Sequence, residues 1–427
     1  MRAVALELAL RAAGQSFPRL SATSYRDVPP PHSWRVDTET EGHGYFALDV
    51  TLTPQGDIHL IEANGSFASF TGCIDGRYDD RARHMVEAFK AKRASSGPVA
   101  VLLPHTDSLG NTIADCFYRI GAFADLLAHT EDAMLRSPDE ELGPERVAIV
   151  CGGVSDIASK VAILTGRLTY QRRPVAFATN PNLLIELVRR RQLRQDGDRY
   201  LVDTSVFHES HCAGLVHDKC VQQQLATGTG FVPLRWARAF SRDECVKVLG
   251  AFRADGMAAI VKMRAGSGSA GIAVLGPVHG QDVVASRLDE LFETAERKYG
   301  PAVRETMFPL EVFQFVRSTP FEMEGREHLW YMRVECLINT GYVDVKPCII
   351  RVCPEPFDDK TYHRAGVIST LRGRTDAIRF MLSPVALLKD RNLSVLDTVR
   401  VNPEVHKRLI QSCAKWCQNA WQPRAPG

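Results

Sequence analysis

Residues 44–66 read GYFALDVTLTPQGDIHLIEANGS, a stretch of two short apolar runs with a turn between them. The first run ends at Asp49, and the second, Ile58–Ile61, leads to Glu62 and Asn64. Two such runs joined by PQGD predict a β-hairpin. If the hairpin pairs in register, the carboxylates of Asp49 and Glu62 face each other. Because strand side chains alternate, Asn64 projects to the same side as Glu62.

Three oxygen donors at one end of a hairpin suit a hard cation that keeps several waters and touches phosphate. The sequence therefore predicts a metal site made of Asp49, Glu62 and Asn64. The alternative is a surface hairpin with two solvated acids.

Length and composition describe an ordinary soluble protein. The 427 residues suffice for two or three domains, and 45% hydrophobic residues, 24% charged residues and a net charge of +2 give no electrostatic case for nucleic acid or membrane partners. No apolar stretch is long enough for a spanning helix. The 11 cysteines include no CxxC pair, which favours reduced thiols and a cytoplasmic location. Met1–Gly14 reads as an amphipathic helix, not a signal peptide, and residues 15–43 as a long irregular connection.

Residues 97–215 alternate between buried strands and helices, which predicts a parallel sheet with helices on its faces. The predicted strands are Val99–Leu103, Arg146–Val150, Val175–Ala178 and Tyr200–Val202, and the predicted helices are Thr112–His129, Asp156–Leu168 and Asn182–Leu193. Polar strand-end loops, residues 105–107 and Asn180, are where such sheets place ligands. His208, His211 and His217 form a loose cluster that is either a metal site or loop histidines.

The second half of the chain contains a glycine-rich segment between two short apolar runs. Residues 259–265 (AIVKMRA) precede Gly266–Gly271 (GSGSAG), and Ile272–Leu275 follow. A dinucleotide-binding fold would need a helix after the last glycine, whereas strand, loop and strand predict a hairpin whose tip can donate backbone N–H groups to phosphates. A surface hairpin without a ligand is the alternative.

Further strands and helices follow the same patterns. We expect strands at Phe308–Val316, Trp330–Asn339 and Tyr342–Val352, the last two paired around Thr340–Gly341, and helices at Asp79–Lys92, Asp218–Gly228, Ser241–Arg253, Asp282–Lys298 and Asn402–Trp421. Arg333 and Arg351 lie on the paired strands, where they are either solvated or directed at anionic chemistry.

Taken together, these pieces resemble the carboxylate-amine ligases of the ATP-grasp superfamily. The matching stretches are His217–Lys219, Val261–Lys262 with the 266–271 loop, Val312–Val316, Arg333 and Arg351, and Asp49 with Glu62 and Asn64. The resemblance implies an α/β fold class: an α+β ATP-grasp fold with a parallel-sheet domain before it. It divides the chain into 1–96 with the metal hairpin, 97–215 as the substrate domain, 216–317 as the lid subdomain, and 318–427.

The order of the motifs departs from the family, because the metal hairpin stands first and not last. A circular permutation would let the hairpin dock beside the 342–352 strand of the same chain. Alternatively, residues 1–92 are the tail of a lost upstream unit, and a second chain in a homodimer completes the site. The family's arginine before the metal aspartate is replaced by Ala47.

The resemblance implies a role for each matching residue. The substrates would be ATP and amino acids or peptides, and the cofactor one or two Mg²⁺ ions, with Mn²⁺ as an alternative. Arg351 and Arg333 would stabilise the transferred phosphoryl group and the acyl oxyanion. The nucleotide would contact Lys219, Lys262, Gly266, Ser267, Gly268, Ser269, Gly271, Gln314, Val316 and Glu322. The implied reaction is ATP-dependent amide or peptide bond formation; a phosphotransferase and a nucleotide-binding protein without turnover are the alternatives.

Overall fold

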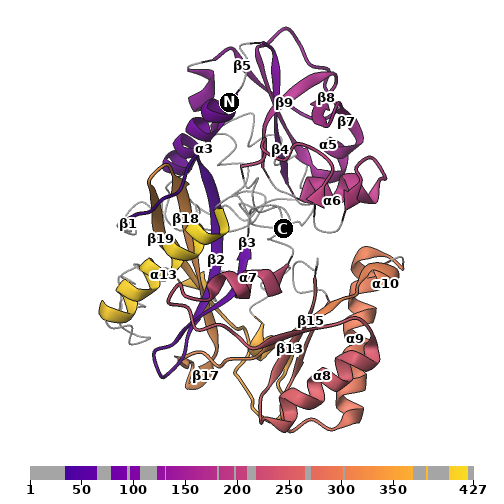
Figure 1. Ribbon diagram of the computed structural model, residues 1–427, viewed down its shortest axis with the longest axis vertical. Helices are drawn as coiled ribbons and strands as arrows, with labels where there is room; N and C mark the ends of the chain where they lie inside the picture. Colours follow the sequence, from indigo (N-terminus) through magenta and orange to yellow (C-terminus); the bar gives the residue numbers. More distant parts are fainter. Residues whose placement is uncertain are drawn as a thin grey trace.

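The described part of the chain is a mixed α/β protein with three main sheets, seen one above another in Figure 1. This confirms the predicted fold class. The computed structural model describes residues 34–64, 78–93, 97–105, 123–129, 131–179, 182–196, 199–208, 218–264, 271–301, 303–368, 381–382 and 403–421. The predicted helix at Met1–Gly14 and the loop residues 266–270 lie outside these residues.

The central sheet has the strand order β1-β19-β18-β2-β3, all antiparallel, with β20 paired to β19. One face is apolar and forms a core with helices α7 and α13. The bounds are β1 Trp34–Asp37, β2 Gly44–Leu52, β3 Ile58–Asn64, β18 Trp330–Asn339, β19 Tyr342–Val352, β20 Met381–Leu382, α7 Lys219–Ala226 and α13 Pro403–Trp421. The predicted hairpins 44–66 and 330–352 are therefore both confirmed.

The N-terminal hairpin completes a sheet of its own chain. Strand β2 pairs with β18, and not with the 342–352 strand (β19) as predicted. Both edges of β19 are already occupied, one by β18 and the other by β1, so the edge of β18 is the one that accepts β2. Strand β1 falls within the segment that we expected to be irregular. A partner chain is not needed to bring this hairpin to the rest of the central sheet.

Helix α7 covers the open edge of β3. The side-chain amide of Gln222 accepts from the Ala63 N–H at 2.8 Å and donates to the Ala63 carbonyl at 3.1 Å. Gln223 donates to the Leu60 carbonyl at 2.7 Å. Side chains thus replace a neighbouring strand, and backbone groups that would otherwise be left unpaired are satisfied.

The upper sheet has the order β5-β6-β4-β9-β8-β7, in which the first four strands are parallel. Helix α3 packs on one face, and α5 and α6 on the other. The bounds are α3 Tyr78–Lys92, β4 Val99–His105, β5 Ala133–Arg136, β6 Val147–Gly153, α5 Val154–Lys160, β7 Val161–Leu164, β8 Arg167–Tyr170, β9 Arg173–Ala178 and α6 Asn182–Arg189.

Two predictions for this domain are wrong. The segment 156–168 is not one helix, because α5 ends at Lys160 and a β7–β8 hairpin follows, turning at Thr165 and Gly166, both with positive φ. Tyr200–Val202 is not a strand of the sheet: β11 (Arg199–Tyr200) pairs only with β10 (Gln195–Asp196). The fourth parallel strand is β5, which sequence analysis missed.

The lower sheet has the order β12-β15-β13-β14, with helices packed on its apolar face. Strands β13 and β14 flank the glycine-rich segment as the predicted hairpin. The bounds are β12 Trp236–Ala239, α8 Arg242–Ala254, β13 Ala259–Met263, β14 Ile272–Leu275, α9 Gln281–Tyr299, α10 Val303–Thr306 and β15 Leu310–Gln314; short elements β16 Phe321–Met323, β17 Arg326–His328 and α11 Arg364–Val367 follow.

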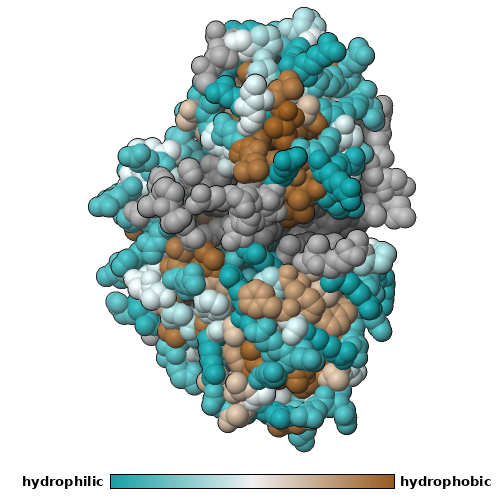
Figure 2. All heavy atoms as spheres, turned by 45° about the vertical axis from the view of Figure 1, so that its right-hand side comes forward, coloured by the Kyte–Doolittle hydropathy of each residue, from teal (hydrophilic) through white to brown (hydrophobic). Residues whose placement is uncertain are grey.

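The visible face of the described residues is mostly hydrophilic, with separate hydrophobic areas (Figure 2). Large exposed apolar side chains occur in both halves, among them Leu164, Phe240 and Val278. Within the described residues, no helix is both long and apolar enough to cross a bilayer.

Candidate active site

The polar face of the central sheet carries a row of charged residues across three strands. Arg333 on β18 lies opposite Asp49 on β2, and Asp49 lies opposite Glu62 on β3. The expected register of the N-terminal hairpin is therefore confirmed. Arg333 Nε donates to Asp49 Oδ1 and its terminal nitrogen to Oδ2, both at 2.6 Å. Although burial opposes the charged form, Asp49 raises the pKa of Arg333 above its ordinary value.

Asn64 joins the two carboxylates of this row. Its amide donates to Asp49 Oδ2 at 3.2 Å and also hydrogen-bonds Glu62. Two carboxylates and an amide oxygen are the donor set that Mg²⁺ accepts. Asp49 Oδ2 accepts from both Arg333 and Asn64, so Oδ1, which accepts from Arg333 Nε, is the oxygen of this carboxylate that keeps a lone pair for a cation. The residues present therefore fit the predicted cation.

Lysines from the lower half of the molecule reach this row. Lys262 Nζ on β13 lies 3.6 Å from Glu62 Oε2. Burial by itself raises the pKa of Glu62, but the charges of Lys262, Lys219 and Arg333 outweigh it and hold the pKa below its usual range. Burial lowers the pKa of Lys262, Glu62 opposes this effect, and the like charge of Lys219 adds to it. The two lysines are thus held close together in a buried setting that an anionic ligand would stabilise.

A second row of charges crosses the lower sheet. Glu311 on β15 lies opposite Arg238 on β12 and opposite Lys262 on β13. The neighbouring residues Leu310 and Val312 point into the apolar core, so Glu311 faces the other way, toward Lys262 and α7. Burial raises the pKa of Glu311 to about 7, although Lys219 opposes the shift.

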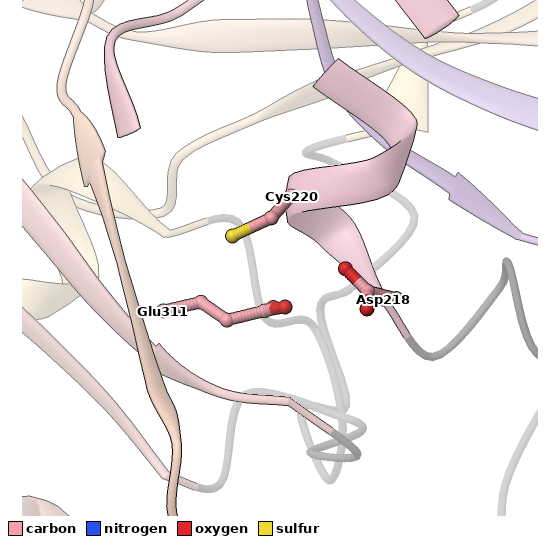
Figure 3. A group of neighbouring side chains, drawn as sticks. All are labelled: Asp218, Cys220 and Glu311. Carbon is pink, nitrogen blue, oxygen red and sulfur yellow. The ribbon is translucent and has the colours of Figure 1, made fainter. Parts of the chain in front are cut away.

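The N-terminus of α7 brings Asp218 and Cys220 to Glu311 of this second row (Figure 3). The backbone N–H of Lys219 also reaches Glu311. Ligand atoms of Asp218, Cys220 and Glu311 lie within 4.8 Å of one another. Asp218 caps the helix through Val221 N–H at 2.9 Å and accepts from Arg238 at 2.7 and 2.6 Å and from Arg264 at 2.9 Å. Burial raises the pKa of Asp218, but these donors together bring it below its ordinary value.

A mostly apolar pocket opens beside Lys262, between the central and lower sheets. It encloses about 570 Å³, part of it open to solvent. Lining residues include Ile260 and Lys262 of β13, Phe313 of β15, and Gln314 and Val316, which we expected to contact the base of a nucleotide. Mostly apolar walls with a few polar groups are typical of small-molecule and cofactor sites.

The remaining predicted site residues lie outside the two charged rows or outside the described residues. Arg351 lies on the same face of the central sheet as Arg333 and donates to the Tyr331 hydroxyl at 3.1 Å. Tyr331 also lines the pocket. Glu322 is exposed in the β16–β17 hairpin and does not line the pocket, so the structure does not bring it to the other residues. Gly271 closes the described part of the β13–β14 turn with a φ of +68°. The residues Gly266, Ser267, Gly268 and Ser269 lie outside the described residues.

Of the three histidines in the predicted loose cluster, the structure describes one. His208 is fully buried and packs on His84, with ring centroids 5.1 Å apart, while His211 and His217 lie outside the described residues.

Sequence reasoning missed Glu311, Arg238 and Tyr331. The signal for Glu311 was present, because FPLEVFQFV places one acid inside an otherwise apolar strand. Arg238 and Tyr331 carry no local signal and are recognised only from the register of their strands.

Comparison with known proteins gives weak similarities. No protein-family model and no curated protein match the chain. A protein from Methylobacillus flagellatus KT with the provisional name gamma-glutamylcysteine synthetase is similar, with a TM-score of 0.42 and 11% identity over 97% of this chain and 94% of that chain. A glutathione synthetase-like effector from Globodera pallida gives a TM-score of 0.35 and 10% identity over 82% and 80%. At TM-scores this low, neither similarity supports a functional assignment.

Proposed function

We propose that this protein is an ATP-dependent carboxylate-amine ligase that forms an amide or peptide bond and releases ADP and phosphate. The observation that carries the proposal is the approach of Glu62 to Lys262, 3.6 Å apart. It brings acids from the first seventy residues to bases from the second half of the chain, as phosphoryl transfer at this site requires. The charged rows and the adjoining pocket support the same function.

The proposed reaction has two steps. A carboxylate oxygen of one substrate attacks the γ-phosphorus of ATP, and ADP leaves. The amine of the second substrate then attacks the carbonyl carbon of the acyl phosphate, loses a proton, and expels phosphate. Both steps gather negative charge, so cations in a site that excludes water lower the barrier.

This chain's residues supply that charge in the proposal. Lys219 and Lys262 bind the α- and β-phosphates, while the pocket beside Gln314 and Val316 takes the adenine. Arg351 shares the polar face of the central sheet and stabilises the oxyanion. Arg333 is already paired to Asp49 and mainly orients that carboxylate.

The proposed cation would be held by Asp49, Glu62 and Asn64. When bound, Mg²⁺ neutralises charge on the β- and γ-phosphates. We also propose that the early position of the hairpin is a circular permutation, supported by the pairing of β2 with β18 in the same chain.

ADP release tests the proposal. The full chain is incubated with ATP, Mg²⁺ and amino acids supplied singly and in pairs, and we expect ADP only where an acid and an amine are both present. A stable phosphorylated product without an amine would instead identify a phosphotransferase.

Glu62→Gln is the matching variant, because it removes a ligand charge at nearly constant shape. We expect turnover to fall by roughly a hundredfold or more. Glu87→Gln changes an exposed acid on α3 in the same way and serves as the control. Full activity in Glu62→Gln would reject the site.

A further inference from the structure

Glu311 occupies the middle of a row of cations and has no use in the proposed reaction. Arg238 lies on one side of it and Lys262 on the other, in direct strand register. Its side chain is completely buried. An acid in this position is held inside the protein next to the two lysines that are proposed to bind phosphate.

The hydrogen bonds of Glu311 are incomplete. Oε2 accepts from the backbone N–H of Lys219 at 3.3 Å, and the backbone N–H of Cys220 also favours the ionised carboxylate, whereas Oε1 is buried and has no hydrogen-bond partner among the described residues. The neighbouring cations bond other carboxylates: a terminal nitrogen of Arg238 donates to Asp218, although its Nε is buried without a hydrogen-bond partner among the described residues, and Lys262 is paired with Glu62. A buried oxygen without a donor destabilises the ionised form of a carboxyl group.

A metal ion does not explain this cluster. Asp218 is already neutralised by Arg238 and Arg264, and the thiol of Cys220 is held protonated because burial raises its pKa. A divalent cation would add charge beside two guanidinium groups and displace their hydrogen bonds. Proton exchange at Glu311 needs no such displacement.

We propose that Glu311 is the internal counter-charge of Lys219 and Lys262, and that it takes up one proton from solvent when a nucleotide polyphosphate binds to those lysines. This inference rests on the proposed function, since it requires a nucleotide at the lysines. Glu311 would act as a positioning residue, because it holds the N-terminus of α7 through the Lys219 N–H and touches no substrate.

The direction of the effect follows from the charges. In the free protein Lys219 favours the ionised carboxylate, while burial raises the pKa of Glu311 to about 7. Phosphates bound to the lysines cancel that favourable charge and raise the pKa further. The affinity for the nucleotide is therefore highest at pH values below the pKa that Glu311 has in the free protein, and it decreases as the pH rises through that pKa. The charged and titratable groups that face Glu311 are Asp218, Lys219 and Cys220 on α7, Arg238 on β12, and Lys262 and Arg264 on β13 and its end.

Calorimetry with Mg²⁺ and ADP tests the inference. For the wild-type full chain we expect the dissociation constant to increase about tenfold between about pH 6.5 and about pH 8.5. Near neutral pH, the apparent enthalpy should depend on the ionisation enthalpy of the buffer, which reports net proton uptake. In Glu311→Gln, affinity should increase, and both the pH dependence and the proton uptake should decrease markedly. The difference between the two proteins removes titration by the nucleotide.

Two further variants keep the test decisive. Glu311→Met removes the carboxylate at similar volume and replaces the amide variant if that one does not fold. Glu186→Gln neutralises a buried acid of α6 that pairs with Arg189 and Arg190, and it should keep the wild-type pH dependence. An unchanged pH dependence in the neutral variants of Glu311, or no proton uptake by the wild type, overturns this inference but not the proposed function. Failure of the wild type to bind the nucleotide overturns the proposed function, and this inference with it.

Discussion

Asp49→Asn should destabilise the central sheet far more than an ordinary polar substitution. The carboxylate forms two 2.6 Å bonds to Arg333, and the two side chains are only 5% and 6% exposed. Without the carboxylate, the buried guanidinium group loses the charge to which it is hydrogen-bonded, and of the charges described above only Glu62 partly compensates it. Breaking a buried pair in this way costs about 3 to 5 kcal/mol of unfolding free energy. Coulomb's law gives a similar value, about 4 kcal/mol at a separation of about 4 Å and an effective dielectric constant of about 20.

Denaturant unfolding followed by tryptophan fluorescence measures this loss, because Trp330 and Trp416 lie in the core of the central sheet. A double-mutant cycle with Arg333→Met isolates the pair. We expect the double variant to be more stable than the sum of the single variants predicts, since an apolar side chain needs no counter-charge. A loss below about 1 kcal/mol in Asp49→Asn, or strict additivity, would refute the reasoning.

Two further predictions concern neighbouring features. Gln222→Met should lower the free energy of unfolding by about 2 to 4 kcal/mol, because it leaves the buried N–H and carbonyl of Ala63 unpaired. Gln224→Met changes an exposed glutamine of the same helix and is the control. Equal unfolding midpoints for the two variants would contradict the role of Gln222 in covering the edge of β3. Burial lowers the pKa of His84 to about 4, below the ordinary value of 6.5, so the unfolded chain binds the proton first and stability decreases as the pH falls through this interval. At about pH 5 the loss of unfolding free energy is on the order of 2 kcal/mol. Between neutral pH and about pH 5, the unfolding midpoint should therefore fall less in His84→Gln than in the wild type. An equal fall in both proteins would exclude the histidine as the cause.

Local signals predicted much of the fold. PQGD and Thr340–Gly341 are turn sequences between apolar runs, and both hairpins form at the expected residues. One turn that sequence analysis missed contains such a signal, Gly166 of the β7–β8 hairpin, but the hairpin turn at Gln171 and Arg172 has two positive φ angles without Gly or Asn. There, tertiary packing fixes a backbone conformation that the residues do not favour.

For the candidate site, spacing predicted which side chains share a strand face but not which strands are neighbours. The facing of Asp49 and Glu62 followed from thirteen residues of hairpin, whereas the pairing of Asp49 with Arg333 joins residues 284 apart. No local pattern specifies a partner at that separation. Glu311 did stand out as an acid in a mostly apolar strand, but the strand register that sets it between Arg238 and Lys262 is not specified by any local pattern.

The long separation between β2 and β18 has a consequence for biosynthesis. Ribosomes add roughly 5 to 20 residues per second, so Asp49 exists for roughly 15 to 60 s before Arg333 has been made. Throughout that interval the emerging hairpin carries an acid destined for burial and an inner strand with no neighbour on one side. Residues 219–232, which cover the opposite edge through Gln222 and Val232, are translated well before β18. Newly made chains thus cover one edge of the hairpin early and leave the other edge available to holding chaperones until β18 has been translated.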